Sequence, residues 1–74
     1  MEEIEKGDMI RFSGSYYMKL DNKTKSILSS LYREGVVLEV NEKFIFIFSD
    51  GEVCYIDRDK FDAVSLRIIG DTSS

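Results

Sequence analysis

Short apolar runs separated by glycine, serine and aspartate dominate this 74-residue chain. Residues 8–12 form one such run, between the Lys6-Gly7 and Ser13-Gly14 turns, and residues 36–40 form another. A third run, residues 63–69, comes near the end of the chain. Apolar runs of this length, bounded by turn residues, are typical of β-strands. The pattern therefore predicts a mostly β chain that closes on a final strand.

The most specific local signal is Asp50-Gly51, which separates the apolar runs 43–48 and 52–56. It predicts a two-residue type I′ hairpin turn, because both central residues of that turn need a positive φ. A two-residue loop fixes the register, so Ser49 should face Glu52. One side of the hairpin then carries Phe44, Phe46, Phe48, Val53 and Tyr55, and the other side carries Ile45, Ile47, Cys54 and Ile56. Both sides are apolar, so we expect both to be covered, one by the interior and one by a helix, a second copy or a partner.

Residues 22–34 have the pattern of a short helix. Asp21 and Asn22 are favourable N-cap residues, and Gly35 offers the left-handed position at which helices often end. Four apolar residues follow helical spacing: Ile27, Leu28, Leu31 and Tyr32. We therefore expect an inserted α-helix over about residues 22–34, and a single helical turn at residues 57–61.

Composition limits the chemistry that this chain can carry out. There is no histidine and one cysteine, Cys54, so disulfides, cysteine/histidine zinc sites and histidine-activated nucleophiles are excluded. The cluster Asp57, Asp59 and Asp62 departs from a calcium loop, because Asp62 stands where that loop requires glycine. We expect a protein that is not an enzyme and that has no cofactor or metal, with Cys54 in the core.

The apolar runs are too short to span a bilayer, and the first residues are acidic where a secretory signal is basic. These features predict a cytoplasmic protein with no membrane contact. The net charge is -4, yet residues 15–33 hold four basic side chains against one acidic side chain. That segment is +3, which leaves -7 on the rest of the chain. We therefore expect a charge-polarised molecule.

The order of these elements over residues 6–69 resembles that of SH3-like small barrels. The passage Gly51-Glu52-Val53-Cys54-Tyr55-Ile56, followed by a turn with Phe61 and then Val64, resembles the end of an SH3 domain. Lys6-Gly7-Asp8-Met9-Ile10-Arg11-Phe12-Ser13-Gly14 and Glu34-Gly35-Val36-Val37-Leu38-Glu39-Val40 are similar to the two halves of a KOW motif. Two features depart from these families: the insertion between the halves, and the missing tryptophans and prolines of peptide-binding SH3 domains.

The resemblance implies a five-stranded SH3-like barrel with one short inserted α-helix, as a single domain over residues 6–69. The ends, residues 1–5 and 70–74, should be loose. In SH3 domains the corresponding long loop supplies tyrosines to the ligand groove, which implies a protein-binding module that docks through its inserted loop and helix. The residues so implied for partner binding, with their neighbours in the insertion, are Tyr16, Tyr17, Met18, Lys19, Lys23, Lys25, Tyr55 and Phe61.

Two other functions stay open. A small acidic decoy, like many phage-encoded inhibitors, could block a nucleic-acid-binding or defence protein with its carboxylates. Those carboxylates are Glu39, Glu42, Glu52, Asp57, Asp59 and Asp62. A KOW-like barrel could instead touch nucleic acid through residues 15–33, although the net charge disfavours it. Homo-oligomerisation is a further expectation if the helix is too short to cover the apolar hairpin.

Overall fold

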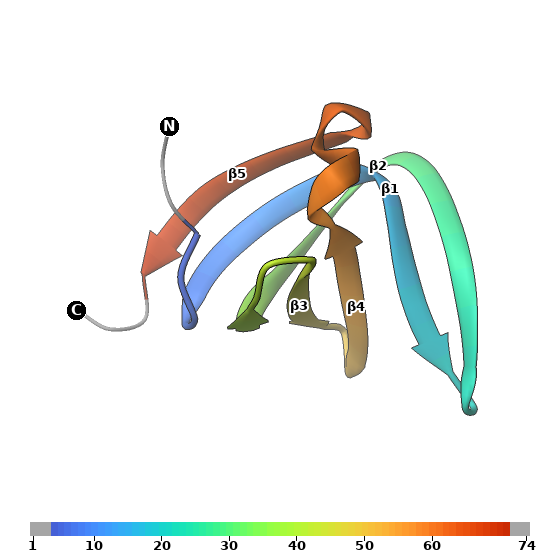
Figure 1. Ribbon diagram of the computed structural model, residues 1–74. Coiled ribbons are helices and arrows are strands. Elements are labelled where there is room, and N and C mark those ends of the chain that lie inside the picture. Colours follow the sequence, from blue (N-terminus) through green and yellow to red (C-terminus); the bar gives the residue numbers. More distant parts are fainter. Residues whose placement is uncertain (1–3, 72–74) are drawn as a thin grey trace.

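The computed structural model describes residues 4–71 (Figure 1). The elements in chain order are β1 (Asp8–Leu20), β2 (Lys23–Val40), β3 (Phe44–Ser49), β4 (Glu52–Asp57), the 3₁₀ helix η1 (Arg58–Ala63) and β5 (Val64–Asp71). The chain is mostly β, as the sequence predicts. Of the ends expected to be loose, residues 1–3 and 72–74 lie outside the described residues, whereas Gly70 pairs with Met9 as part of β5.

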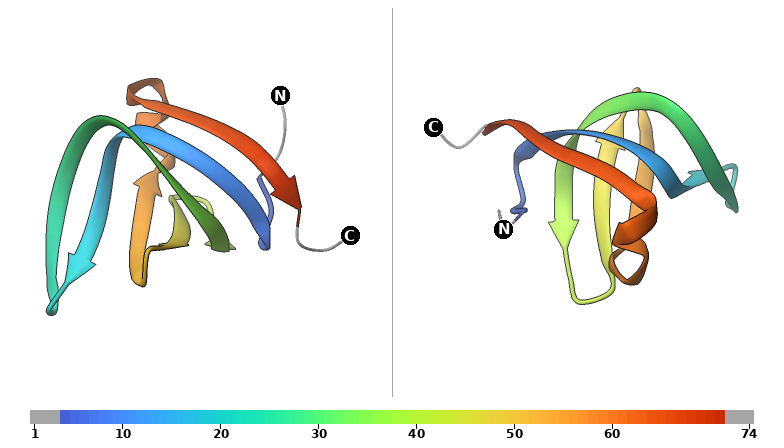
Figure 2. Two further views of the ribbon diagram at one scale, coloured as in Figure 1. Left: turned by 180° about the vertical axis from the view of Figure 1, so that it is seen from behind. Right: turned by 90° about the horizontal axis from the view of Figure 1, so that it is seen from above.

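The strands form one antiparallel sheet in the order β2-β3-β4-β1-β5, with an additional pairing between β1 and β2. β1 pairs with β2 along most of its length, with β5 through residues 8–14 and with β4 through Tyr17 and Met18. The pairings among β1, β2, β3 and β4 therefore run in a continuous ring, with β5 beside β1 (Figures 1 and 2). This arrangement is compatible with a small barrel-like fold.

The core lies on the inner side of this curved sheet. It consists of alternate residues from four strands: Ile10, Phe12, Tyr16, Met18, Val37, Ile45, Ile47, Cys54 and Ile56. Burying an isoleucine or phenylalanine side chain contributes about 1.5–3 kcal/mol. Because successive side chains of a strand point to opposite sides, the residues between these core positions face outward.

The hairpin of β3 and β4 confirms the predicted turn and register. Asp50 has φ 52° and Gly51 has φ 77°, so both central residues occupy the left-handed region. Ser49 pairs with Glu52, Ile47 with Cys54 and Ile45 with Ile56. The predicted helical turn is also present as η1, where the Asp57 carboxylate accepts a hydrogen bond from the Asp59 backbone N–H at 2.9 Å.

The helix expected over residues 22–34 is wrong, because these residues belong to β2. Asp21 and Asn22 have φ values of 49° and 64° and form a tight turn, across which Leu20 pairs with Lys23. Asp and Asn tolerate the left-handed region, so residues that are suited to capping a helix make a hairpin turn instead. The resulting hairpin projects from the rest of the sheet (Figure 1). We call its projecting part, residues 19–26, the arm.

The apolar spacing that suggested a helix is produced by an irregularity in β2. Phe12 pairs with Arg33 and Gly14 with Ser29, so residues 30–32 bulge out of the ladder. Leu31 and Tyr32, within this bulge, are 77% and 61% exposed. Gly35 does not have a positive φ either; it is buried, and a Cβ built there would lie 2.5 Å from the Phe48 carbonyl oxygen. Glycine is thus required at this position by close packing of two strands, not by the end of a helix.

Candidate binding surface

The outer side of the sheet carries a row of side chains that crosses four strand segments. Tyr17 on β1 pairs with Tyr55 on β4, Tyr55 pairs with Phe46 on β3, and Phe46 pairs with Glu39 on β2. Residues directly opposite each other on neighbouring strands point to the same side of a sheet. Phe44, two residues from Phe46, joins this side. We call Tyr17, Phe44, Phe46 and Tyr55 the aromatic face.

The four rings of the aromatic face pack on one another, with Tyr55 at the centre. The Tyr55 ring stacks on Tyr17 with centroids 5.1 Å apart, and it meets Phe44 edge-on at 5.3 Å. Phe46 lies 5.6 Å from Tyr55. Such aromatic pairs add about 0.5–1.5 kcal/mol beyond the area they bury. The rings are therefore held in fixed positions, yet each remains only half-buried.

Charged and polar groups from two other segments contact the aromatic face at its edge. Lys60 of η1 donates a hydrogen bond from Nζ to Tyr17 Oη at 3.0 Å, and its Nζ lies 5.6 Å from the Tyr17 ring centroid. This hydrogen bond is the main cause of a raised Lys60 pKa, so Lys60 stays positively charged at neutral pH. Tyr55 Oη donates to Thr24 Oγ1 on the arm at 3.4 Å.

Two of the residues expected to bind a partner lie in the core instead. Tyr16 and Met18 are buried, at 4% and 6% exposure, and Tyr16 packs edge-on against Phe12. Phe61 is half-buried and packs against the core. The predicted partner-binding residues are therefore divided in the structure. Tyr17 and Tyr55 meet on the aromatic face, whereas Tyr16, Met18 and Phe61 do not join them.

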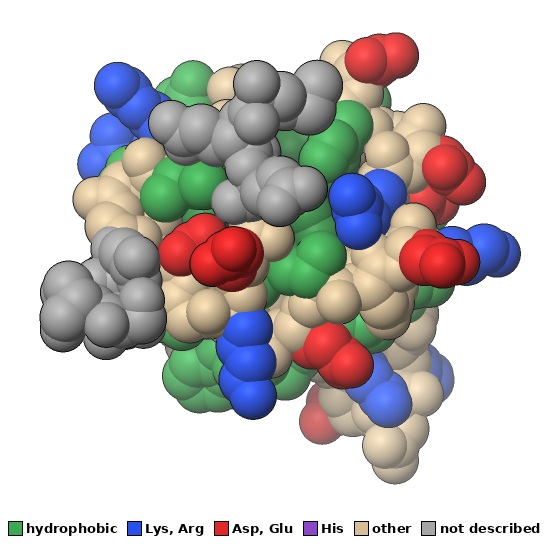
Figure 3. Space-filling view, turned by 60° about the vertical axis from the view of Figure 1, so that its left-hand side comes forward, with side chains coloured by type: hydrophobic (Ala, Val, Ile, Leu, Met, Phe, Trp, Pro, Cys, Tyr) green, Lys and Arg blue, Asp and Glu red, His purple; other side chains and the backbone are tan. Residues whose placement is uncertain are grey.

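Phe61 lines an open groove beside β5, together with Tyr32, Leu66 and Ile68. Two arginines, Arg11 and Arg67, also line it. On the side of the molecule that comes forward in Figure 3, hydrophobic side chains reach the surface between scattered charges. None of these lining residues belongs to the aromatic face, so the groove is a separate surface. It combines apolar side chains with positively charged ones.

The lysines of the arm are exposed but divide between its two sides. Lys19 lies two residues from Tyr17 on β1 and so shares its side of the sheet. Lys25 pairs with Met18, and Lys23 pairs with Leu20, which places both lysines on the opposite side. Only Lys19 of the three can therefore border the aromatic face.

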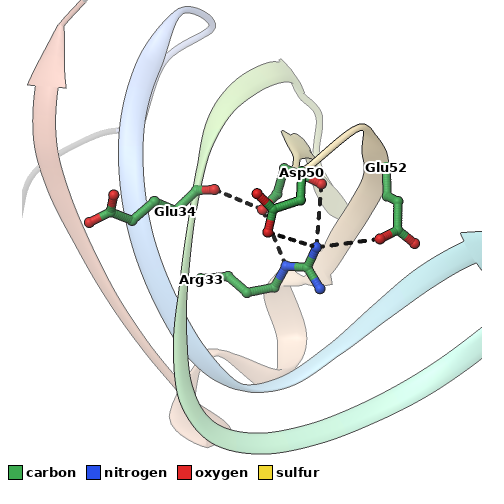
Figure 4. Close-up of polar contacts among 5 residues, drawn as sticks. Arg33, Glu34, Asp50 and Glu52 are labelled. Atoms are coloured by element: carbon green, nitrogen blue, oxygen red, sulfur yellow. Dashed lines mark hydrogen bonds and ion pairs between the residues drawn. The ribbon is translucent and has the colours of Figure 1, made fainter.

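Arg33, the fourth basic residue of the predicted positive segment, is held by the β3–β4 turn (Figure 4). Its Nε donates to Ser49 Oγ at 3.2 Å and its Nη2 to the Ser49 carbonyl oxygen at 3.3 Å. The same Nη2 lies 3.6 Å from an Asp50 carboxylate oxygen and 3.7 Å from one of Glu52. Ser49 Oγ in turn donates to the Glu34 carbonyl oxygen at 2.7 Å. Arg33 thus links β2 to the β3–β4 turn, and its positive charge is paired with the carboxylates of Asp50 and Glu52.

The predicted acidic surface also loses members to internal contacts. Glu52 pairs with Arg33, and Asp57 caps η1. The remaining acidic side chains of that set are exposed: Glu39 on β2, Glu42 in the turn before β3, and Asp59 and Asp62 on η1.

Cys54 is fully buried between β-strand neighbours. Burial is the main cause of a raised pKa of its thiol, so the sulfur stays protonated and unreactive at neutral pH. Among residues 4–71, no group of three or more cysteine, aspartate or glutamate side chains is placed to hold a metal ion. In the same part of the chain, no helix is long and apolar enough to cross a membrane.

Sequence reasoning did not identify three residues at the aromatic face. Phe44 and Phe46 belong to this face, and Lys60 contacts its edge. The hairpin register already placed both phenylalanines on the side of Tyr55, which was the available signal for them. Lys60 had no such signal, because its contact with Tyr17 joins residues 43 positions apart in the sequence.

Comparisons with protein-family models, with curated proteins and with solved structures find no match to this chain.

Proposed function

We propose that this chain is a non-enzymatic protein-binding module with an SH3-like barrel fold, and that it docks on a protein partner through the aromatic face. The ring of pairings among four strands, with a 3₁₀ helix between β4 and β5, supports the SH3-like assignment. A long hairpin, formed by β1 and β2, takes the place of the long loop of SH3 domains.

The observation that carries the proposal is the packing of four aromatic rings on the outside of the sheet. Within residues 4–71 the only helical element is η1, and it contacts these rings at their edge through Lys60. Phe48 and Val53, on the same side, are 47% and 36% exposed and enlarge the apolar area. Rigid, exposed tyrosine side chains are typical of interface hot spots, because they give a large contact area at a low entropic cost.

The two alternative functions have less support. Nucleic-acid binding relied on a +3 segment, but Arg33 is paired with Asp50 and Glu52 and the arm lysines face different sides. The acidic decoy relied on six carboxylates, of which Glu52 and Asp57 make internal contacts. Neither arrangement presents the concentrated charge of one sign that such binding requires.

The proposal is tested by affinity capture with the purified chain as bait, followed by mass spectrometry of the captured proteins. Tyr17→Ala removes an outward-facing ring of the aromatic face, and Tyr32→Ala is a matched control, since Tyr32 is an exposed tyrosine on the β2 bulge. We expect a partner that Tyr17→Ala loses and Tyr32→Ala keeps. With that partner purified, Tyr17→Ala should raise the Kd at least about 30-fold, as expected for a hot-spot residue.

Circular dichroism and urea unfolding of both variants show whether the fold is kept. A partner that binds folded Tyr17→Ala as tightly as the unaltered chain contradicts the proposal. Loss of the partner in the Tyr32→Ala variant instead would assign the contact to the bulge of β2.

A further inference from the structure

The aromatic face has opposite charges at its two ends. At the β1 end, Lys19 shares the side of Tyr17, and Lys60 Nζ lies 3.0 Å from Tyr17 Oη. At the β2 end, Glu39 pairs with Phe46 and is exposed. Neither Lys19 nor Glu39 has an ion-pair partner among the described residues. Three strand spacings separate the two ends, which is about 14 Å.

We propose that the occupant of the aromatic face is a second copy of this chain, bound face to face. The inference rests on the proposed function, because it names the partner of the same surface. An apolar centre with a positive end and a negative end is complementary to itself when one copy is reversed relative to the other. A partner of one uniform charge would be attracted by one end and repelled by the other.

The charges also select one two-fold axis. An axis that lies in the interface, parallel to the strands and between β3 and β4, places Tyr17 of one copy over Glu39 of its partner. Lys19 lies two residues further along β1, about 7 Å from that point and within reach of its long side chain. The same axis places Tyr55 over Phe46 of the partner copy, so aromatic rings meet at the centre. An axis across the strands would instead place like ends together, which costs binding energy. The dimer is therefore isologous, with two identical contacts between Lys19 and Glu39.

Analytical ultracentrifugation of the full chain, from about 5 μM to 1 mM, tests this arrangement over the affinity range of small interfaces. The variants are Lys19→Glu, Glu39→Lys and an equimolar mixture of the two. Both positions are exposed, so the substitutions leave the core intact. Arg67→Glu on β5 is the matched control, because Arg67 is an exposed basic residue that pairs with Arg11 away from the aromatic face.

We expect a concentration-dependent dimer whose Kd rises at least about 5-fold with either single charge reversal, since each reversal creates two repulsive contacts per dimer. The mixture should restore the affinity. In a mixed dimer the Lys19→Glu chain carries carboxylates at both positions and the Glu39→Lys chain carries ammonium groups at both, so each of the two contacts again joins opposite charges. The control Arg67→Glu should dimerise as the unaltered chain does.

A monomer over the whole concentration range overturns the inference. A dimer that the two reversals do not weaken, or that their mixture does not restore, overturns it as well. In each of these cases the proposed function keeps its own test, because capture of a different protein that depends on Tyr17 requires no self-association. If instead no captured protein depends on Tyr17, ultracentrifugation of the charge reversals still decides whether the chain dimerises through this face.

Discussion

Ile47 and Phe48 are neighbours on β3 that face opposite sides of the sheet. Ile47 is fully buried in the core, whereas Phe48 is 47% exposed. Replacing Ile47 with alanine leaves a cavity and should lower the free energy of unfolding by about 2–5 kcal/mol. Replacing Phe48 with alanine removes a larger but half-exposed side chain outside the core, so we expect a loss below about 1 kcal/mol.

Urea unfolding followed by circular dichroism measures both losses. If Ile47→Ala does not fold, Ile47→Val keeps the comparison possible, with an expected loss of about 0.5–1.5 kcal/mol. A loss above about 2 kcal/mol for Phe48→Ala, or below about 0.5 kcal/mol for Ile47→Val, would contradict the assigned inner and outer sides.

Where a turn sets the register of two strands, the sequence predicts correctly which side of the sheet each residue faces. The Asp50-Gly51 turn predicts the correct side for residues 44–48 and 53–56. Tyr16 and Tyr17 were not separated, although the same alternation continues along β1 through Ile10, Phe12, Tyr16 and Met18. The first strand was expected to end at Phe12, because Ser13-Gly14-Ser15 has the composition of a turn. In the structure Gly14 has φ 107° and remains within the ladder, so the alternation passes through it.

The arm shows how one pair of residues decides between two elements. Asp21-Asn22 suits both a helix N-cap and a type I′ turn, and the flanking apolar residues do not separate these possibilities. Pairing between β1 and β2 resolves them, and such long-range pairing cannot be read from local spacing. The sequence therefore predicts the wrong element over residues 22–34, although it correctly places a boundary between two elements at Asp21-Asn22.

The arm depends on its turn more than on packing, because residues 21–26 are all exposed. Asn22 has φ 64°, a conformation that a β-branched residue adopts poorly. Asn22→Val should therefore speed amide hydrogen exchange in the arm about 5- to 30-fold, which corresponds to about 1–2 kcal/mol of left-handed strain. Amides of β3 and β4 should exchange as before, since the arm opens locally.

Asn22→Gly is the control for this experiment, because glycine adopts a positive φ without strain and should not speed exchange in the arm. Faster exchange throughout the sheet in Asn22→Val would mean that the arm unfolds only together with the core. Equal exchange in both variants would exclude the tight turn itself.

For the whole molecule, the distribution of charge separates protein binding from nucleic-acid binding. The net charge is -4, and Arg33 is committed to Asp50 and Glu52. The sequence shows the excess of basic residues between 15 and 33. The hydrogen bonds that hold the Arg33 side chain against Ser49, however, depend on the fold. The basic side chains of this protein can therefore neutralise only a few phosphates of a nucleic acid at once. Non-specific affinity for nucleic acid depends on the number of phosphates neutralised.

We therefore expect single-stranded DNA and RNA oligonucleotides to bind with a Kd above about 100 μM at physiological salt. Fluorescence anisotropy with labelled oligonucleotides measures this affinity. The double variant Glu39→Lys and Glu42→Lys brings the net charge to zero and serves as the comparison, since both residues are exposed. If overall repulsion limits binding, this variant should bind more tightly than the unaltered chain, and added salt should reduce the difference. Micromolar binding by the unaltered chain, falling steeply with salt, would instead show that the lysines of the arm act together, and it would favour a nucleic-acid partner over a protein one.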